Sequence, residues 1–311
     1  MNDNDISKDK KKQGKIINHL DFIKSKKILK QIFDILDSKK ELEIVKYNKK
    51  TQNRLNMTIA NYNQYFQTEI EIIPAKDKFG EFININNEEE ESYYHIFFGR
   101  NKEETKQYYL TENDDVKKIK VKIDFNIKSV NKLFYYCECI ETMTFKKFNR
   151  NDIKDMSYMF CKCTSLKKID FTCFNTDNIT DISGMFFACE ELKEVDLTKI
   201  KTNKVTNMKS MFYGCSLLKG IDLSNFVVNN VTDMSYMFNG CSSLEFVIVS
   251  NFDTENVDNM DNMFKKCSSL KDIDFSNFKI NDFTNIDDIL NECSEELKSK
   301  ILEKDKNLRY R

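Results

Sequence analysis

Apolar residues recur along the second half of the chain with a period of 26 residues. A Met-Phe pair marks this period most clearly, and degenerate copies of it stand at Leu133-Phe134 and Ile289-Leu290. The full copies are Met159-Phe160, Met185-Phe186, Met211-Phe212, Met237-Phe238 and Met263-Phe264. Cysteines keep the same step, at Cys137, Cys163, Cys189, Cys215, Cys241, Cys267 and Cys293. Because a fixed period of this length is typical of repeat proteins, residues 127–294 are predicted to form seven stacked units.

Each unit is predicted to contain a short helix followed by a short strand. In the unit that starts at Val231, the apolar residues of the first half have the spacing of one helix face, at Val231, Met234, Met237, Phe238 and Cys241. Thr232 or Asp233 is expected to cap this helix, and Gly240 is expected to provide its left-handed exit. The second half follows the pattern of a short strand, with Leu244, Val247, Val249 and Phe252.

Stacking is expected to bury columns of equivalent side chains, since a unit this small cannot bury its apolar face alone. One predicted column contains Phe148, Phe174, Ile200, Phe226, Phe252 and Phe278. A second contains Ile153, Ile179, Val205, Val231, Val257 and Phe283. The repeated cysteines are expected to form a third, as small side chains where space is tight. The predicted fold class is therefore an α/β repeat solenoid with a parallel sheet and short helices.

Five parts of the chain are distinguished on this basis. They are a disordered basic tail at 1–15, a helical segment at 16–60, a β-rich cap at 61–126, the repeats at 127–294 and a C-terminal helical cap at 295–311. In the β-rich cap, strand-like alternation occurs at Glu69–Ile73, Phe82–Ile85, Tyr93–Phe98 and Lys117–Phe125. Ser294–Lys304 is predicted to form an amphipathic helix whose Leu297, Ile301 and Leu302 cover the last unit. Such caps keep the ends of a stacked sheet from aggregating.

Units such as NNVTDMSYMFNGCSSL and NMKSMFYGCSLLKGIDLSNF resemble the BspA-like leucine-rich-repeat family. The resemblance covers more than half of the chain. It implies a right-handed solenoid of the leucine-rich-repeat type, a function in adhesion or protein recognition, and no shared chemistry. Surface-displayed members carry a signal peptide or lipid anchor, whereas Met1 to Lys15 is polar and charged. We therefore expect an intracellular scaffold, with a surface adhesin as one alternative.

Residues 19–55 contain an amphipathic helical pattern formed by Ile28, Leu29, Ile32, Phe33 and Leu36. This pattern is similar to an F-box, although Lys26-Lys27 stands where Pro and Glu are expected. The resemblance implies that these apolar residues bind a Skp-type adaptor and that the repeats present substrates to a cullin ubiquitin ligase. The alternative is a helical cap or an unrelated interaction segment.

Composition argues against several other classes of protein. The 49 Lys and Arg residues nearly balance the 50 Asp and Glu residues, which gives a net charge of −1 and removes the usual electrostatic argument for nucleic acid as partner. No apolar stretch is long enough to span a membrane. With two histidines and no Gly-rich phosphate loop, the chain shows no catalytic constellation, so we expect neither an enzyme nor a cofactor.

The cysteines bear on location and on metal binding. We expect them to be reduced, small buried side chains of a cytoplasmic protein, because disulfides belong to oxidising compartments. Lys8–Lys15 leaves a nuclear location open. Cys137-x-Cys139 and Cys161-x-Cys163 place two cysteines one residue apart, whereas zinc sites usually have two to four intervening residues. We therefore expect no metal site.

The outward positions of the predicted strands give a candidate binding face. Asp170, Asp196, Asp222 and Asp274 form one predicted column, in which like charges about 5 Å apart would repel one another until a basic partner binds. The alternative is that lysines one column over neutralise them, namely Lys167, Lys193, Lys219 and Lys271. Phe246 and Ile248 interrupt the polar columns and are predicted to anchor a protein ligand on a monomeric scaffold. The alternative reading of this unit is a degenerate repeat.

Overall fold

A computed structural model of the chain describes residues 23–25, 49–55, 64–85, 88–150, 152–174, 176–279, 284–286 and 288–304. The chain divides into two units, residues 1–67 and 68–311. The predicted β-rich cap and the predicted repeats therefore lie in the same unit, apart from residues 61–67. Within the part of the chain that the structure describes, no helix is long and apolar enough to cross a membrane.

The first unit is described only in part. Its helix α4 spans Lys49–Leu55, with Thr51 buried, and the Arg54 guanidinium donates a hydrogen bond to the carbonyl oxygen of Ile23. Residues 64–66 are also helical, and Phe66 is buried. The predicted adaptor-binding residues Ile28, Leu29, Ile32, Phe33 and Leu36 lie outside the described residues.

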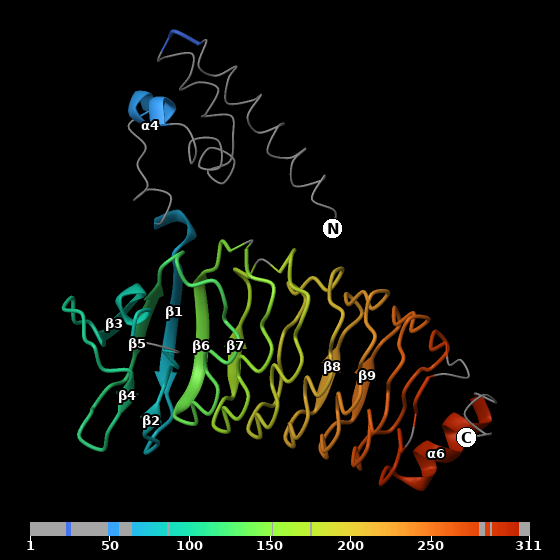
Figure 1. Ribbon diagram of the computed structural model, residues 1–311. Helices are drawn as coiled ribbons and strands as arrows, with labels where there is room; N and C mark the ends of the chain where they lie inside the picture. Colours follow the sequence, from blue (N-terminus) through green and yellow to red (C-terminus); the bar gives the residue numbers. More distant parts are fainter. Residues whose placement is uncertain are drawn as a thin grey trace. The chain divides into compact units, whose positions relative to one another are not determined.

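The second unit begins with a sheet in the order β3-β5-β1-β6-β7. Its strands are β1 (Thr68–Pro74), β3 (Tyr94–Phe98), β5 (Ile119–Ile123), β6 (Ile140–Lys147) and β7 (Lys168–Asp170). The pairs β3–β5, β5–β1 and β1–β6 are antiparallel, whereas β6–β7 is parallel. Buried residues alternate with half-buried ones along β5, which is what a strand with one core-facing side requires. The antiparallel part thus runs without a break into the first parallel pair (Figure 1).

Three of the four strands predicted before the repeats are confirmed, as β1, β3 and β5. The fourth prediction, a strand at Phe82–Ile85, is wrong. Phe82 and Ile83 are both buried although they are neighbours in the sequence, and a strand would turn one of them away from the core. Close by, β2 (Gly80–Glu81) pairs with β4 (Tyr109–Leu110), and a short 3-10 helix, η1, spans Glu91–Tyr93.

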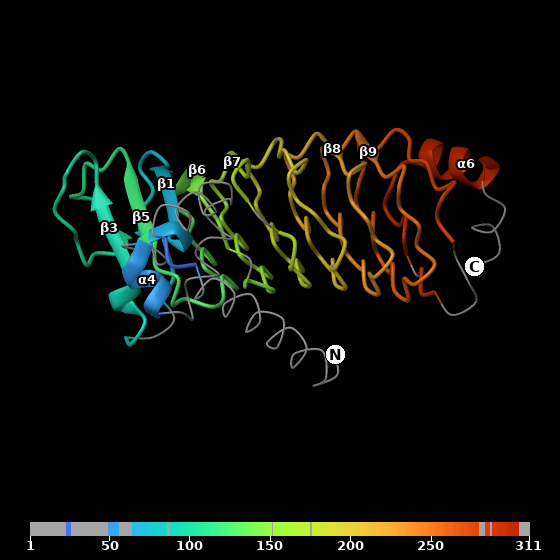
Figure 2. The ribbon, with the colours of Figure 1, turned by 90° about the horizontal axis from the view of Figure 1, so that it is seen from above.

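From Lys132 onward the chain forms coils that lie one against the next (Figures 1 and 2). Residues 26 positions apart are neighbours, because a backbone N–H of one coil donates to a carbonyl oxygen of the following coil. At the Met-Phe pair these bonds run from Phe134 to Met159 (2.9 Å), Phe160 to Met185 (2.9 Å), Phe186 to Met211 (2.8 Å), Phe212 to Met237 (2.8 Å) and Phe238 to Met263 (2.8 Å). Further along each coil, β8 (Gly220–Asp222) pairs in parallel with β9 (Phe246–Ile248).

The short helix predicted in each unit is wrong, because the structure has consecutive turns there. In the coil from Val231, the N–H groups of Met234, Tyr236, Phe238 and Gly240 all donate to the next coil, over 2.8 Å in each case. An α-helix would use the same N–H groups for bonds within itself. Tyr236 and Gly240 also adopt left-handed φ values of 60° and 78°, which interrupt any helix. The left-handed conformation expected at Gly240 is thus present, but within a turn.

The core between the coils consists of columns of equivalent residues. The rings of Phe134, Phe160, Phe186, Phe212, Phe238 and Phe264 stack with centroid separations of 5.4–5.5 Å. The two predicted apolar columns are buried throughout, except that Phe283 lies outside the described residues. The repeated cysteines are buried as well. The thiol of Cys215, for example, donates to the carbonyl oxygen of Phe186 over 3.1 Å.

One coil holds a buried cation. Arg150 occupies the position at which later coils have Thr176, Thr202 and Thr254, and its side chain is only 1% exposed. The Arg150 guanidinium donates to both carboxylate oxygens of Asp152, over 2.9 Å and 3.1 Å, and to the carbonyl oxygen of Ile127. A buried charge of this kind is stable only when it is paired and hydrogen-bonded.

The coils end at helix α6 (Glu295–Lys304). The Ser294 hydroxyl oxygen accepts a hydrogen bond from the backbone N–H of Leu297 over 3.2 Å, which caps the helix N-terminus. Leu297 and Ile301 are buried, as the amphipathic pattern predicts. The side chain of Leu302, which was predicted to join them, is outside the described residues.

Candidate functional site

The predicted aspartate column lies where the extended segments of successive coils end, and its carboxylates have a local structural role. Oδ1 of Asp170, Asp196, Asp222 and Asp274 accepts a hydrogen bond from the backbone N–H two residues further on, over 2.8–2.9 Å. This arrangement is an Asx turn, which lets the chain leave the sheet. The column therefore closes turns whether or not a partner is bound.

These hydrogen bonds also stabilise the charged form of two of the carboxylates, those of Asp196 and Asp222. The backbone N–H of Ser224, followed by its hydroxyl, lowers the pKa of Asp222. The pKa of Asp196 is lowered in the same way, first by the backbone N–H of Thr198. Hydrogen bonds to the ionised form stabilise it, so Asp196 and Asp222 carry their charge without a basic partner.

The alternative prediction, that neighbouring lysines neutralise the aspartates, is wrong for two of the four lysines. Lys167 lies 3.6 Å from a carboxylate oxygen of Glu141 and 3.7 Å from one of Glu191. Lys271 forms an ion pair with Glu245. These glutamates belong to other columns, so Lys167 and Lys271 do not neutralise Asp170 and Asp274, whereas the charge of Lys199 acts on Asp196.

Phe246 and Ile248 point outward from β9, with exposed fractions of 53% and 41%, while Val247 between them is buried. The ring of Phe246 lies over Gly220 of the preceding coil. A Cβ atom on Gly220 would stand 2.2 Å from the ring atom Cζ of Phe246, far inside van der Waals contact. Gly220 and Phe246 hold equivalent positions one period apart, so the bulky residue fits because its neighbour has no side chain. Both residues stand in the sequence one period apart, but the period predicts only that their positions are equivalent and not that their side chains match in size.

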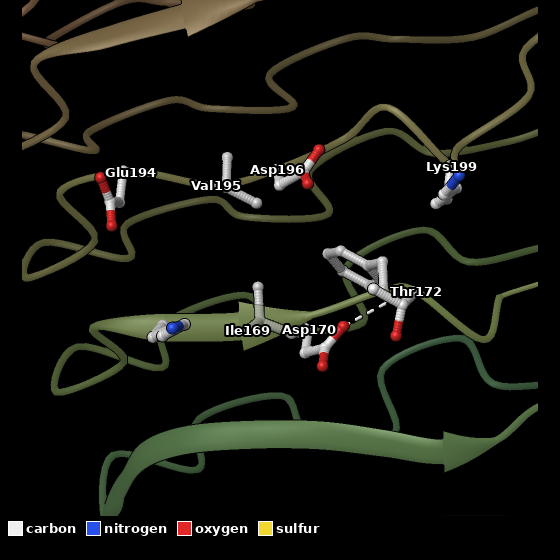
Figure 3. A pocket seen from close by; sticks show the side chains of 9 residues that line it. Ile169, Asp170, Thr172, Glu194, Val195, Asp196 and Lys199 are labelled. Carbon is white, nitrogen blue, oxygen red and sulfur yellow. Dashed lines mark hydrogen bonds between the residues drawn. The ribbon is translucent and has the colours of Figure 1, made fainter.

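A hollow of about 480 Å³ opens on the same face between the coils of β7 and Glu194–Asp196 (Figure 3). It is lined by Lys168, Ile169, Asp170, Phe171, Thr172, Glu194, Val195, Asp196 and Lys199. Ile169 and Phe171 are buried, and Val195 is half-buried. The hollow thus combines apolar walls with carboxylate and ammonium groups.

The parallel ladder is open where the hollow lies. β7 pairs with β6, and β8 pairs with β9, but residues 194–196 belong to no strand. Across the described residues, no backbone hydrogen bond joins 168–172 to 194–198. The two coils are held together on either side of the opening, where the Glu191 N–H donates to the Thr164 carbonyl (3.2 Å) and the Lys201 N–H donates to the Thr176 hydroxyl (2.6 Å). The unit sequence around Val195 follows the common pattern and gives no signal of this opening.

The described residues include one of the two histidines, His95. His95 lies 3.1 Å from Glu104 and 3.4 Å from Asp124, in the antiparallel part of the sheet. Where the structure describes the chain, no group of three or more His, Cys, Asp or Glu side chains is placed to hold a metal ion. Cys139 and Cys161, from the two Cys-x-Cys pairs, are buried, and burial raises the pKa of each thiol to about 11.

A family model with the description "Mycoplasma protein of unknown function, DUF285" matches residues 106–220 and 216–304. These repeats are related to those of BspA-like proteins. Comparison with curated proteins and with solved structures gives no match. The matched segments contain most of the coils, the aspartate column, the hollow and the Phe246 site. Because together they span more than half of its length, the chain belongs to the DUF285 family.

Proposed function

We propose that this chain is a non-catalytic recognition scaffold, which binds a protein ligand on the outward face of a right-handed solenoid of the BspA-like, leucine-rich-repeat type. The supporting features are the 26-residue stacking of the coils and their relation to BspA-like repeats. In a stack of this kind each coil contacts only its neighbours, so the outward side chains form a long continuous surface that suits an extended partner.

The exposure of Phe246 and Ile248 on an otherwise polar face carries this proposal. Singly exposed apolar residues are common on protein surfaces, but here two of them stand together on one three-residue strand. Asp222 and Asp274 flank Ile248 at the equivalent positions of the coils before and after it. An apolar centre with a charged rim is the usual composition of a binding hot spot.

The double variant Phe246→Ser, Ile248→Asp tests the proposal in the full-length chain. Partners are captured from cell extract with the wild-type and variant proteins side by side and compared quantitatively by mass spectrometry. Tyr136→Ser is a matched control, because Tyr136 is 44% exposed but belongs to the turn region of its coil. We expect the double variant to lose the partner and the control to keep it. Retention of every partner by a folded double variant would reject the proposal.

We also propose a monomeric, cytoplasmic protein, with the nucleus as a second location. In the repeated column, thiols such as Cys189 and Cys241 donate an S–H hydrogen bond to a Phe carbonyl oxygen of the previous unit, over 3.0–3.1 Å. Only a reduced cysteine has this proton, which favours a reducing compartment. Cell fractionation tests the location, and recovery at the cell surface would instead favour the adhesin alternative. Light scattering tests the monomer.

The second candidate function is an F-box-type substrate adaptor, favoured by the amphipathic pattern from Ile28 to Leu36. Its test is the full-length variant Ile32→Asp, Phe33→Asp. Loss of a Skp-type adaptor from the captured proteins, with the ligand of the Phe246 face still bound, would establish this function. If the wild-type chain captures no such adaptor, the segment has another role.

A further inference from the structure

We propose that the ligand of the outward face is an extended basic peptide segment, which inserts a Lys or Arg side chain into the hollow between β7 and Glu194–Asp196 and places an apolar residue on Phe246 and Ile248. This inference rests on the proposed function and names the class of ligand. It depends on the hollow, the open ladder and the charges between the two sites.

The hollow has the chemistry of a pocket for a basic side chain. Its apolar walls, Ile169 and the half-buried Val195, suit the methylene groups of Lys or Arg, while Asp170 and Asp196 at its rim suit the charged end (Figure 3). Long basic side chains commonly bury their stems in this way and keep the charge near polar groups. The Asx turns fix both carboxylates in place before any ligand arrives.

Three carboxylates and two ammonium groups line the hollow, from Asp170, Glu194, Asp196, Lys168 and Lys199. On the path to Phe246 the intervening coil presents Gly220 and the charged Asp222, while the charge of Lys219 acts on Glu245 of the next coil. A cationic segment therefore meets opposite charge at the hollow and along the path to β9.

The distance between the two sites sets the spacing within the ligand. The hollow lies between the first two of four successive coils, and Phe246 stands on the fourth. Hydrogen-bonded coils lie about 4.8 Å apart, and the stacked rings of neighbouring coils are 5.4–5.5 Å apart, so the separation is about 12–14 Å. An extended chain covers about 3.3 Å per residue, so the basic and apolar residues are three or four positions apart. A helical ligand would need about eight positions for the same distance, at 1.5 Å per residue.

The test uses the full-length protein and fluorescein-labelled dodecapeptides on a Ser/Thr background, with one Arg and one Leu separated by one to nine positions. Binding is followed by fluorescence polarisation at low salt. We expect the tightest binding at a separation of three or four, with affinity that falls as salt is added. A maximum near eight, equal binding at all separations, or equal binding when Glu replaces Arg would overturn the inference.

Two variants examine the hollow itself. Asp170→Asn, Asp196→Asn removes both charges but keeps an Oδ1 acceptor for the Asx turns, and about tenfold weaker binding of the best peptide is expected. Val195→Phe fills the hollow and is expected to weaken binding at least as much. The control is Asp181→Asn, which alters an equivalent Asx turn on another side of the coil, where Asp181 Oδ1 accepts from the Ser183 N–H over 2.8 Å. Wild-type affinity in either hollow variant would overturn the inference.

These outcomes are separable from those of the proposed function. If Phe246→Ser, Ile248→Asp loses the captured cellular partner while the hollow variants keep it, the scaffold function stands and the basic-peptide inference fails. If the double variant and both hollow variants all keep the partner, both fail.

Discussion

Two phenylalanines in one coil allow a direct test of the stacked core. Phe238 has no exposed surface, and its ring stacks on Phe212 (centroids 5.5 Å apart, planes at 2°) and on Phe264 (5.4 Å, 7°). Phe246, eight residues later, is 53% exposed. Phe238→Ala and Phe246→Ala therefore delete the same ring from the same coil, once inside the core and once on its surface.

The expected costs differ severalfold. Removing a fully buried Phe side chain forfeits about 1.5–3 kcal/mol of transfer free energy, and each stacked pair adds roughly 0.5–1.5 kcal/mol. For Phe238→Ala we expect a loss of about 3–5 kcal/mol, which matches the usual range for such truncations. Phe246→Ala exposes little new apolar surface, so its cost is expected to be below about 1 kcal/mol.

Urea unfolding followed by far-ultraviolet circular dichroism measures both values, from the shift in midpoint and the slope of each transition. If Phe238→Ala does not fold, Phe238→Leu replaces it, with an expected cost of about 1 kcal/mol. A loss below about 1 kcal/mol for Phe238→Ala, or equal losses at the two positions, would show that the Phe column is not the continuous core described above.

Three further predictions follow from particular contacts. In the folded protein only Cys173 should react with Ellman's reagent, because burial raises the pKa of the other nine thiols and shields them, and denaturant should release all ten. Burial tends to raise the pKa of Asp152, but the hydrogen bonds and the charge of Arg150 lower this pKa overall. The stabilisation that this ion pair gives the folded protein is therefore present above about pH 4 and is lost as the pH falls through the lowered pKa. Arg150→Met should remove this part of the dependence of Tm on pH. Gly220→Ala should displace the ring of Phe246 and weaken ligand binding, because the new methyl group would occupy the place of the ring. Since Phe246 lies on the surface, the loss of stability should be about 1 kcal/mol or less. Binding as tight as that of the wild type would contradict the proposal that Phe246 depends on the glycine beneath it.

The sequence by itself determined which residues are neighbours across the coils. A strict 26-residue period means that equivalent side chains occupy equivalent places, so the Phe and Cys columns and the outward position of Phe246 could be predicted from spacing, and the amphipathic pattern predicted α6. The period does not specify hydrogen-bond partners. The N–H groups of Met234, Tyr236 and Phe238 can bond within a helix or to the next coil, and only the packed stack offers the second set of acceptors.

The candidate site shows the same division between sequence and structure. Charge and exposure at Asp196 and Phe246 follow from their places in the repeat, whereas the Asx-turn role of the aspartates depends on where each extended segment ends. The hollow beside Val195 was not predictable, because its unit has the same pattern as its neighbours. The pattern of apolar residues determines which face of a segment is buried. The distance between two coils depends on the packing of all the side chains between them, and this packing is determined only in the folded chain.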